Sequence, residues 1–122
     1  MKKILVADNE LMNQFYLKKL CDSPDVLVMT ANNGQEAVNL CEVHKFDLIF
    51  MDIQMPVMNG TEALIQIRNI ESDVFHRTPI IAISSDFGLY ESTIKEFDFD
   101  EMILNPLQVA TVKEIIKKYL MV

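Results

Sequence analysis

The sequence predicts an α/β fold in which a parallel sheet is covered by helices on both faces. Short apolar runs alternate with longer amphipathic runs five times along the 122 residues. The apolar runs are hydrophobic at nearly every position, as expected for strands that helices cover on both sides. Turn-forming Asn, Gly and Pro residues lie at several of the junctions. We therefore expect a doubly wound parallel sheet of five strands flanked by five helices.

The first half of the chain contains two of these strand-and-helix pairs. Residues 2–8 (KKILVAD) and 26–31 (VLVMTA) are apolar runs of strand length. Residues 11–23 (LMNQFYLKKLCDS) and 34–45 (GQEAVNLCEVHK) are longer and mix apolar with polar side chains, as amphipathic helices do. The turn formers at 32–34 (NNG) mark the start of the second helix.

The third and fourth pairs follow the same pattern. Residues 46–52 (FDLIFMD) and 78–84 (TPIIAIS) are predicted strands. Residues 60–72 (GTEALIQIRNIES) and 89–97 (LYESTIKEF) are predicted helices. The fourth helix lies in an acidic segment that contains Gly88, so we expect it to be the least rigid.

The last pair consists of a strand at 101–104 (EMIL) and a helix at 108–120 (QVATVKEIIKKYL), separated by a turn at Asn105-Pro106. One stripe of the helix is apolar, and we expect this stripe to pack on the sheet. The stripe contains Val109, Val112, Ile115, Ile116, Tyr119 and Leu120.

Composition narrows the functional classes. The formal net charge of -7 opposes binding to the phosphate backbone of nucleic acids, so we expect no nucleic-acid partner. The apolar runs are far shorter than the roughly 20 residues that span a bilayer, so we expect no membrane insertion. Cys21 and Cys41 lack any metal-binding spacing, which favours reduced structural thiols in a cytoplasmic protein.

Polar side chains end four of the predicted strands. They are Asp8, Asp52, Ser84 and Asn105. If the strand order is 2-1-3-4-5, the first and third strands are neighbours and these side chains converge at the edge where open parallel sheets bind ligands. Two carboxylates at such close range repel unless a cation lies between them, and Mg²⁺ prefers oxygen ligands of this kind. A divalent metal between Asp8 and Asp52 is therefore a reasonable hypothesis.

Local roles offer an alternative for each residue. Asp8 could cap a helix, Asp52 could begin a turn and Ser84 could satisfy nearby backbone groups. For any one residue alone this alternative would be preferred. Their joint position at strand ends favours a common site.

Several stretches resemble the receiver domain of two-component response regulators over essentially the whole chain. The most specific is MDIQMPVMNG at 51–60, and ILVADNELMNQ, TANNGQEAV and RTPIIAISS support it. These motifs are most similar to those of receiver domains attached to hybrid histidine kinases. The resemblance implies a single receiver domain over residues 1–122, with a flavodoxin-like sheet in the order 2-1-3-4-5. Such a domain acts alone or is part of a larger protein.

The resemblance also implies the chemistry of the site. Asp52 would take a phosphoryl group from a histidine kinase or a histidine phosphotransfer protein. Mg²⁺ would be bound by Asp8, Asp52 and the backbone carbonyl of Gln54, and the Ser84 hydroxyl would bond a phosphoryl oxygen. Gly60, in the loop after Asp52, is free to adopt backbone angles that other residues avoid.

Three positions depart from the family pattern. Ala7 stands where a second acid usually precedes the metal-binding Asp, Asn105 stands at the lysine position, and Met102 replaces an aromatic residue. Losing one acid and one lysine leaves the net charge of the pocket unchanged, so we expect Mg²⁺ binding to survive. We interpret Met102 as core filling.

Two functions remain open. The first is a phosphoacceptor with an altered readout, and the second is a pseudo-receiver that binds proteins without phosphorylation. A small phosphatase has little support because Gln54 stands where an acid or base would be needed, and His44 and His76 lie away from the strand ends. We expect no enzymatic activity beyond self-phosphorylation and self-dephosphorylation.

We expect the phosphodonor to bind at the first helix. We also expect a downstream protein target, which the sequence does not identify. Receivers commonly dock the phosphodonor near this helix, where Met12, Phe15 and Tyr16 could face outward. We expect at least two of these three side chains to lie in the core instead.

Overall fold

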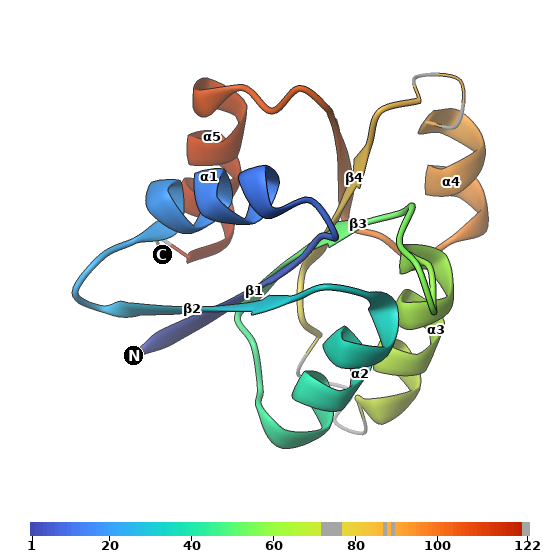
Figure 1. Ribbon diagram of the computed structural model, residues 1–122, viewed down its shortest axis with the longest axis horizontal. Helices are drawn as coiled ribbons and strands as arrows, with labels where there is room; N and C mark the ends of the chain where they lie inside the picture. Colours follow the sequence, from blue (N-terminus) through green and yellow to red (C-terminus); the bar gives the residue numbers. More distant parts are fainter. Residues whose placement is uncertain (72–76, 87, 89, 121–122) are drawn as a thin grey trace.

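The computed structural model describes residues 1–71, 77–86, 88 and 90–120. Within these residues five parallel strands form one sheet in the order β2-β1-β3-β4-β5 (Figure 1). The strands are β1 (Lys2–Ala7), β2 (Val26–Ala31), β3 (Leu48–Asp52), β4 (Ile80–Ser84) and β5 (Glu101–Leu104). The helices are α1 (Leu11–Cys21), α2 (Gly34–Val43), α3 (Gly60–Ile70), α4 (Tyr90–Glu96) and α5 (Val109–Leu120). The predicted fold class and strand order are confirmed.

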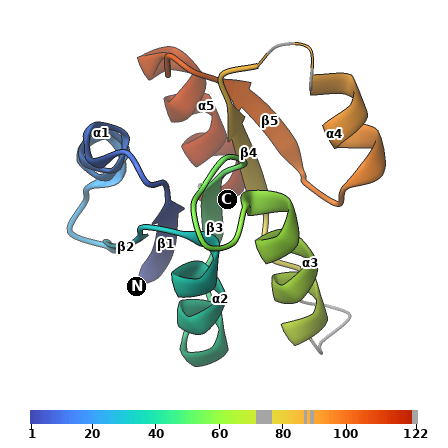
Figure 2. The same ribbon diagram turned by 45° about the vertical axis from the view of Figure 1, so that its right-hand side comes forward.

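The helices cover the sheet on two faces. Helices α1 and α5 lie on one face, while α2, α3 and α4 lie on the other (Figures 1 and 2). Each face has its own apolar core, because one cluster contains side chains of α1 and α5 and the other contains side chains of α2 and α3. This doubly covered arrangement explains why the strand sequences are apolar almost throughout.

Successive residues of each strand enter opposite cores. In β1, Ile4 and Val6 face α1 and α5, whereas Leu5 and Ala7 face α2 and α3. In β3 the even-numbered Phe50 likewise faces α1 and α5. The period of two in a strand therefore directs the next even-numbered positions of both strands, 8 and 52, toward the same face.

Local hydrogen bonds fix the starts of two helices. The Asn33 side chain accepts a hydrogen bond from the backbone N–H of Glu36 at 2.8 Å, and Asn59 accepts one from Glu62 at 2.9 Å. These N-caps satisfy donors that the first turn of a helix leaves unpaired. Each asparagine directly precedes the glycine, Gly34 or Gly60, at which the sequence predicts that a helix begins.

The structure differs from the sequence prediction at the margins. Strand β2 is at the edge of the sheet and most of its residues are partly exposed, since helices cover an edge strand less completely. Val109 is 45% exposed, because the buried face of α5 begins only at Val112. Residue 72, at the end of the predicted third helix, and residue 89, at the start of the fourth, lie outside the described residues.

The two cysteines behave as structural thiols. Neither forms a disulfide, and burial raises the pKa of both Cys21 and Cys41 to about 12. Thiols with such a pKa stay protonated and unreactive at neutral pH. In the described part of the chain, no helix has the length and apolar character that crossing a membrane requires.

Candidate functional site

The register of the central strands brings Asp8 and Asp52 together. Strands β1 and β3 pair in parallel with Ala7 opposite Met51, so the next residue on each strand path is an aspartate. Asp8 is fully buried and Asp52 is 8% exposed. The negative charge of Asp8 acts on the carboxyl group of Asp52, which lies beside it. The predicted convergence of these two acids at the carboxyl edge of the sheet is observed.

Electrostatics make this pair costly to ionise. Burial, followed by the negative charge of Asp8, raises the pKa of Asp52 to about 7. The Gln54 backbone N–H opposes this rise in the pKa, while the negative charge of Glu10 adds to it. Among the described side chains, no ion pair includes either aspartate. Two buried carboxylates without a cation between them have the donor chemistry that Mg²⁺ requires.

The first turn of α1 holds Asp8. The backbone N–H of Glu10 donates to Asp8 Oδ1 at 2.8 Å, and the side-chain amide of Asn13 donates to Oδ2 at 3.0 Å. The Gln14 amide donates to the Asp8 backbone carbonyl at 2.5 Å and to Asn32 Oδ1 at 2.7 Å. The N-cap residue of α1 is Glu10, and no side chain caps this helix, so the alternative role of Asp8 as a helix cap is wrong. These donors instead hold the Asp8 carboxylate beside Asp52.

A tight turn follows Asp52. The Gln54 N–H donates to Asp52 Oδ1 at 3.1 Å, which places Gln54 beside the carboxylate. A Cβ atom on Gly60 would lie 2.3 Å from the Asp52 carbonyl oxygen, so close approach of the chain requires glycine here. The expectation that Gly60 adopts unusual backbone angles is wrong, because the residue with positive φ in this loop is Val57 at 68°.

Ser84 and Asn105 lie at the same edge of the sheet. Asp52 pairs with Ile83 of β4, and Ser84 is the next residue. The backbone N–H of Asn105 donates to the Ser84 carbonyl at 2.8 Å. The Ser84 hydroxyl accepts from the Asp86 N–H at 3.0 Å and donates to the Asp86 carbonyl at 3.4 Å. This hydroxyl thus has the local backbone role proposed as its alternative, at the end of a strand next to β3.

The departures at positions 7 and 102 are core residues. Ala7 is fully buried and Met102 is 6% exposed, both within the cluster on the α2 and α3 face. The core-filling interpretation of Met102 is confirmed. Across the residues that the structure describes, no group of three Asp, Glu, His or Cys side chains is arranged to hold a metal. A metal at Asp8 and Asp52 would therefore rely on backbone oxygen and water for its other ligands.

Helix α1 exposes an apolar patch beside the site, formed by Leu11, Met12 and Phe15. These side chains are 73%, 77% and 65% exposed. The expectation that at least two of Met12, Phe15 and Tyr16 are core residues is wrong. The inward stripe of α1 contains Gln14 instead, together with two apolar residues, so the apolar side chains at 11, 12 and 15 face away from the sheet.

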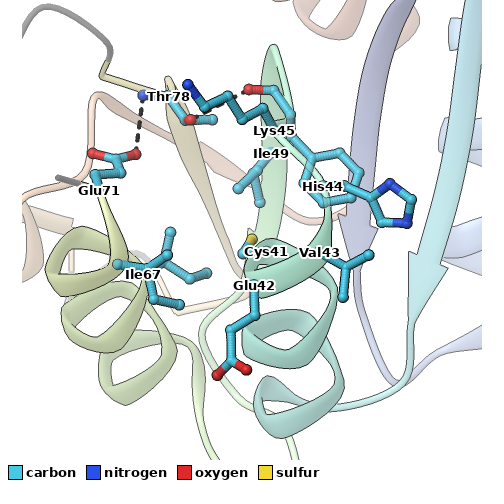
Figure 3. Close-up of a pocket in the computed structure, with 11 residues that line it drawn as sticks. Cys41, Glu42, Val43, His44, Lys45, Ile49, Ile67, Glu71 and Thr78 are labelled. Atoms are coloured by element: carbon cyan, nitrogen blue, oxygen red, sulfur yellow. Dashed lines mark hydrogen bonds between the residues drawn. The ribbon is translucent and has the colours of Figure 1, made fainter. Parts of the chain in front are cut away.

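A separate cavity of about 310 Å³ lies at the opposite edge of the sheet. Its wall includes Cys41 and Ile67 at the ends of α2 and α3, with Thr78 just before β4 (Figure 3). The Thr78 N–H donates to Glu71 at 3.1 Å, and both residues line this cavity. None of the predicted site residues lines it. His44 also lies here, away from Asp52, while His76 lies outside the described residues.

This chain is similar in sequence to a known protein family and to individual known proteins. Residues 4–117 match the family described as response regulator receiver domain. The polar-differentiation response regulator DivK of Brucella anthropi is 32% identical over 96% of this chain and 94% of that protein. Hybrid signal transduction histidine kinase L of Dictyostelium discoideum is 35% identical over 96% of this chain, which spans 7% of that kinase.

A solved structure extends the comparison. The response regulator TrrA of Thermotoga maritima, in complex with Mg²⁺-BeF, superposes with a TM-score of 0.83. It is 31% identical to this chain, and the match covers 98% of this chain and all of that one. The match to DivK covers nearly a whole protein, whereas the chain spans only 7 to 13% of the sensor kinases it resembles.

Proposed function

Because the chain belongs to the response regulator receiver domain family, we propose that Asp52 accepts a phosphoryl group in two-component signalling. The donor is a histidine kinase or a histidine phosphotransfer protein. One observation carries the proposal: Asp52 lies almost fully buried against Asp8 at the carboxyl edge of the sheet, with no cation among the described residues paired to either. A buried carboxylate with a raised pKa at the end of a central strand is typical of a functional site.

The residues at this edge fit Mg²⁺. Asp8 and Asp52 would supply carboxylate oxygens and Gln54 its backbone carbonyl, a set of hard oxygen donors that leaves room for water. When bound, the metal would neutralise charge on the incoming phosphoryl group. The TrrA structure, in complex with Mg²⁺-BeF, supports this assignment by similarity.

The transfer step uses Asp52 as a nucleophile. A carboxylate oxygen of Asp52 attacks the phosphorus of a phosphohistidine, an O–P bond forms and the N–P bond breaks, and the imidazole nitrogen leaves with the electron pair. The reaction needs ionised Asp52, while the hydrogen bond from the Gln54 N–H fixes the orientation of the side chain. Ser84, freed from Asp86, would then bond a phosphoryl oxygen. The protein carries out no turnover beyond its own phosphorylation and dephosphorylation.

The readout of phosphorylation is altered in this chain. Asn105 offers a neutral amide where the family pattern has lysine, so it cannot form an ion pair with the phosphoryl group. Met102 lacks the ring whose rotation signals phosphorylation in the family and is fixed in the core. We therefore propose that phosphorylation changes other surfaces of the domain, without an aromatic switch at residue 102. A downstream protein target would bind these surfaces.

The apolar patch on α1 suits the phosphodonor. Leu11, Met12 and Phe15 expose most of their surface on the helix that follows Asp8. Side chains at positions i, i+1 and i+4 of one helix can enter a groove on a partner helix, as in helix docking. A helical histidine phosphotransfer protein docked here would lie beside Asp52.

A phosphotransfer assay tests this function. The protein is incubated with Mg²⁺ and a panel of phosphohistidine donors, and a small phosphodonor serves in a parallel reaction. We expect an adduct that is stable to acid and labile to alkali, absent from Asp52→Ala. No adduct with any donor or with the small phosphodonor would contradict the proposal.

A pseudo-receiver is the second candidate, and the burial of Ala7 in the core favours it. This position provides no third acid, and the described residues hold no group of three acidic, histidine or cysteine ligands. Such a module would bind its partner through α1 without phosphate. It would therefore bind a histidine phosphotransfer protein equally well before and after Asp52→Ala and would never take up phosphate.

A further inference from the structure

Asn13 has a contact that the transfer step does not use. Its side-chain amide donates to Asp8 Oδ2 at 3.0 Å, while Oδ1 accepts from the Glu10 N–H at 2.8 Å. The Gln14 amide fixes the backbone of the same residue through its carbonyl at 2.5 Å. Two consecutive amide side chains in the first turn of α1 thus hold the carboxylate and the main chain of Asp8.

The two aspartates are held differently. The carboxylate of Asp52 accepts one backbone hydrogen bond, from Gln54. Both carboxylate oxygens of Asp8 accept hydrogen bonds. The donor to Oδ2 is the side chain of Asn13, which is half-buried and can therefore be substituted without disturbing the core. Because Ala7 adds no second acid, Asp8 is the one carboxylate besides Asp52 that the described site offers a metal. The orientation of Asp8 therefore decides the geometry of the metal site.

From these contacts we infer that Asn13 is a positioning residue, which orients the Asp8 carboxylate toward Asp52 for binding Mg²⁺. The inference rests on the Mg²⁺ site of the proposed function. An amide suits this role because it donates to a carboxylate without adding charge. A lysine would compete with the metal as a cation, and an acid would repel Asp8. Each carboxylate oxygen keeps a second lone pair, so the hydrogen bond from Asn13 leaves Asp8 able to bind the ion.

Positioning has a consequence for ion selectivity. Mg²⁺ requires near-ideal octahedral geometry at short distances, whereas Ca²⁺ accepts longer and more variable ones. If Asn13 fixes the position of Asp8, its removal weakens Mg²⁺ binding more than Ca²⁺ binding. A general loss of stability would weaken both ions alike. The ratio of the two affinities therefore separates positioning from a merely structural role.

The experiment measures the affinities for Mg²⁺ and for Ca²⁺ by calorimetry in wild type, Asn13→Ala and Asn39→Ala. Asn39→Ala makes the same chemical change at an exposed position of α2, where the Asn39 side chain accepts a hydrogen bond from Gln35 at 2.9 Å. Melting curves in chelator check that each variant is folded. For Asn13→Ala we expect Mg²⁺ affinity to fall about tenfold, the size typical for loss of a group that orients a ligand. Ca²⁺ affinity falls less, and Asn39→Ala matches wild type.

Two results would overturn the inference while leaving the proposed function intact. One is an Asn13→Ala variant with wild-type Mg²⁺ affinity, and the other is an equal loss for both ions. A wild-type protein that binds no Mg²⁺ would overturn both the inference and the Mg²⁺ site on which it rests.

Discussion

Replacing Asp52 by asparagine should stabilise the metal-free protein at alkaline pH. Asp52 is 8% exposed and lies against Asp8, so its ionised form is both desolvated and repelled. Asparagine has the same shape, can still accept the hydrogen bond from Gln54 and carries no charge. Asp52→Asn therefore removes an unfavourable charge while keeping the packing of the site.

The magnitude follows from the pKa of Asp52. This pKa rises from 3.8 to about 7 on folding, and each pKa unit corresponds to about 1.4 kcal/mol. The folded state thus binds the proton more tightly than the unfolded state, so stability is highest at low pH and is lost as the pH rises from about 4 through about 7. At pH 8 the substitution should stabilise the protein by up to about 4 kcal/mol, and at pH 5 the gain should be about 3 kcal/mol smaller.

Urea denaturation in chelator at pH 5 and pH 8 measures both values. Asp25→Asn is the control, because Asp25 is exposed and its side chain forms no ion pair in the described structure; it should change stability by less than about 0.5 kcal/mol at either pH. Saturating Mg²⁺ should stabilise wild type and thereby reduce the advantage of Asp52→Asn. A gain at pH 8 that is absent, or that does not change with pH, would contradict the burial of ionised Asp52 against Asp8.

Three further substitutions test the loop after Asp52, the packing of α2 against it and the ion pairs of Arg68, each by urea denaturation. Val57→Asn should stabilise by about 1 kcal/mol, because Val57 has a φ of 68° and asparagine tolerates this conformation; Val43→Asn, at an exposed helical position, should not. Gly34→Ala should destabilise by about 2 kcal/mol, since its Cβ would lie 2.3 Å from a backbone oxygen of the β3–α3 loop, and Gly88→Ala should have a smaller effect. Arg68→Met should cost about 2 kcal/mol, since the arginine is 12% exposed and pairs with three acidic side chains.

Much of the fold is predictable because its signals are local. The run LIFM is apolar at every position, which favours a strand covered on both faces, and this placed the aspartate that follows it at the carboxyl edge of the sheet. The caps at Asn33 and Asn59 are likewise formed within four residues. The meeting of Asp8 with Asp52 then follows from the pairing of β1 with β3.

The sequence was less informative where α1 departs from the usual amphipathic pattern. Helix α1 exposes Met12 and Phe15 and buries Gln14, so hydrophobicity gave the wrong inward face. Gln14 lies three residues before Leu17 and seven before Cys21, so it shares their face of the helix. This spacing was the signal that could have identified Gln14 as an inward-facing partner of the site. The positive φ of Val57 had no sequence signal, because β-branched residues rarely adopt it.

An NMR titration of the wild-type protein with Mg²⁺ tests the central claim most directly. If Asp8 and Asp52 form one metal site with the Gln54 carbonyl, the largest amide shifts should occur at these three residues and their immediate neighbours, and Asp52→Asn should weaken or abolish them. An absence of response at millimolar Mg²⁺, or shifts centred on another part of the molecule, would contradict the account.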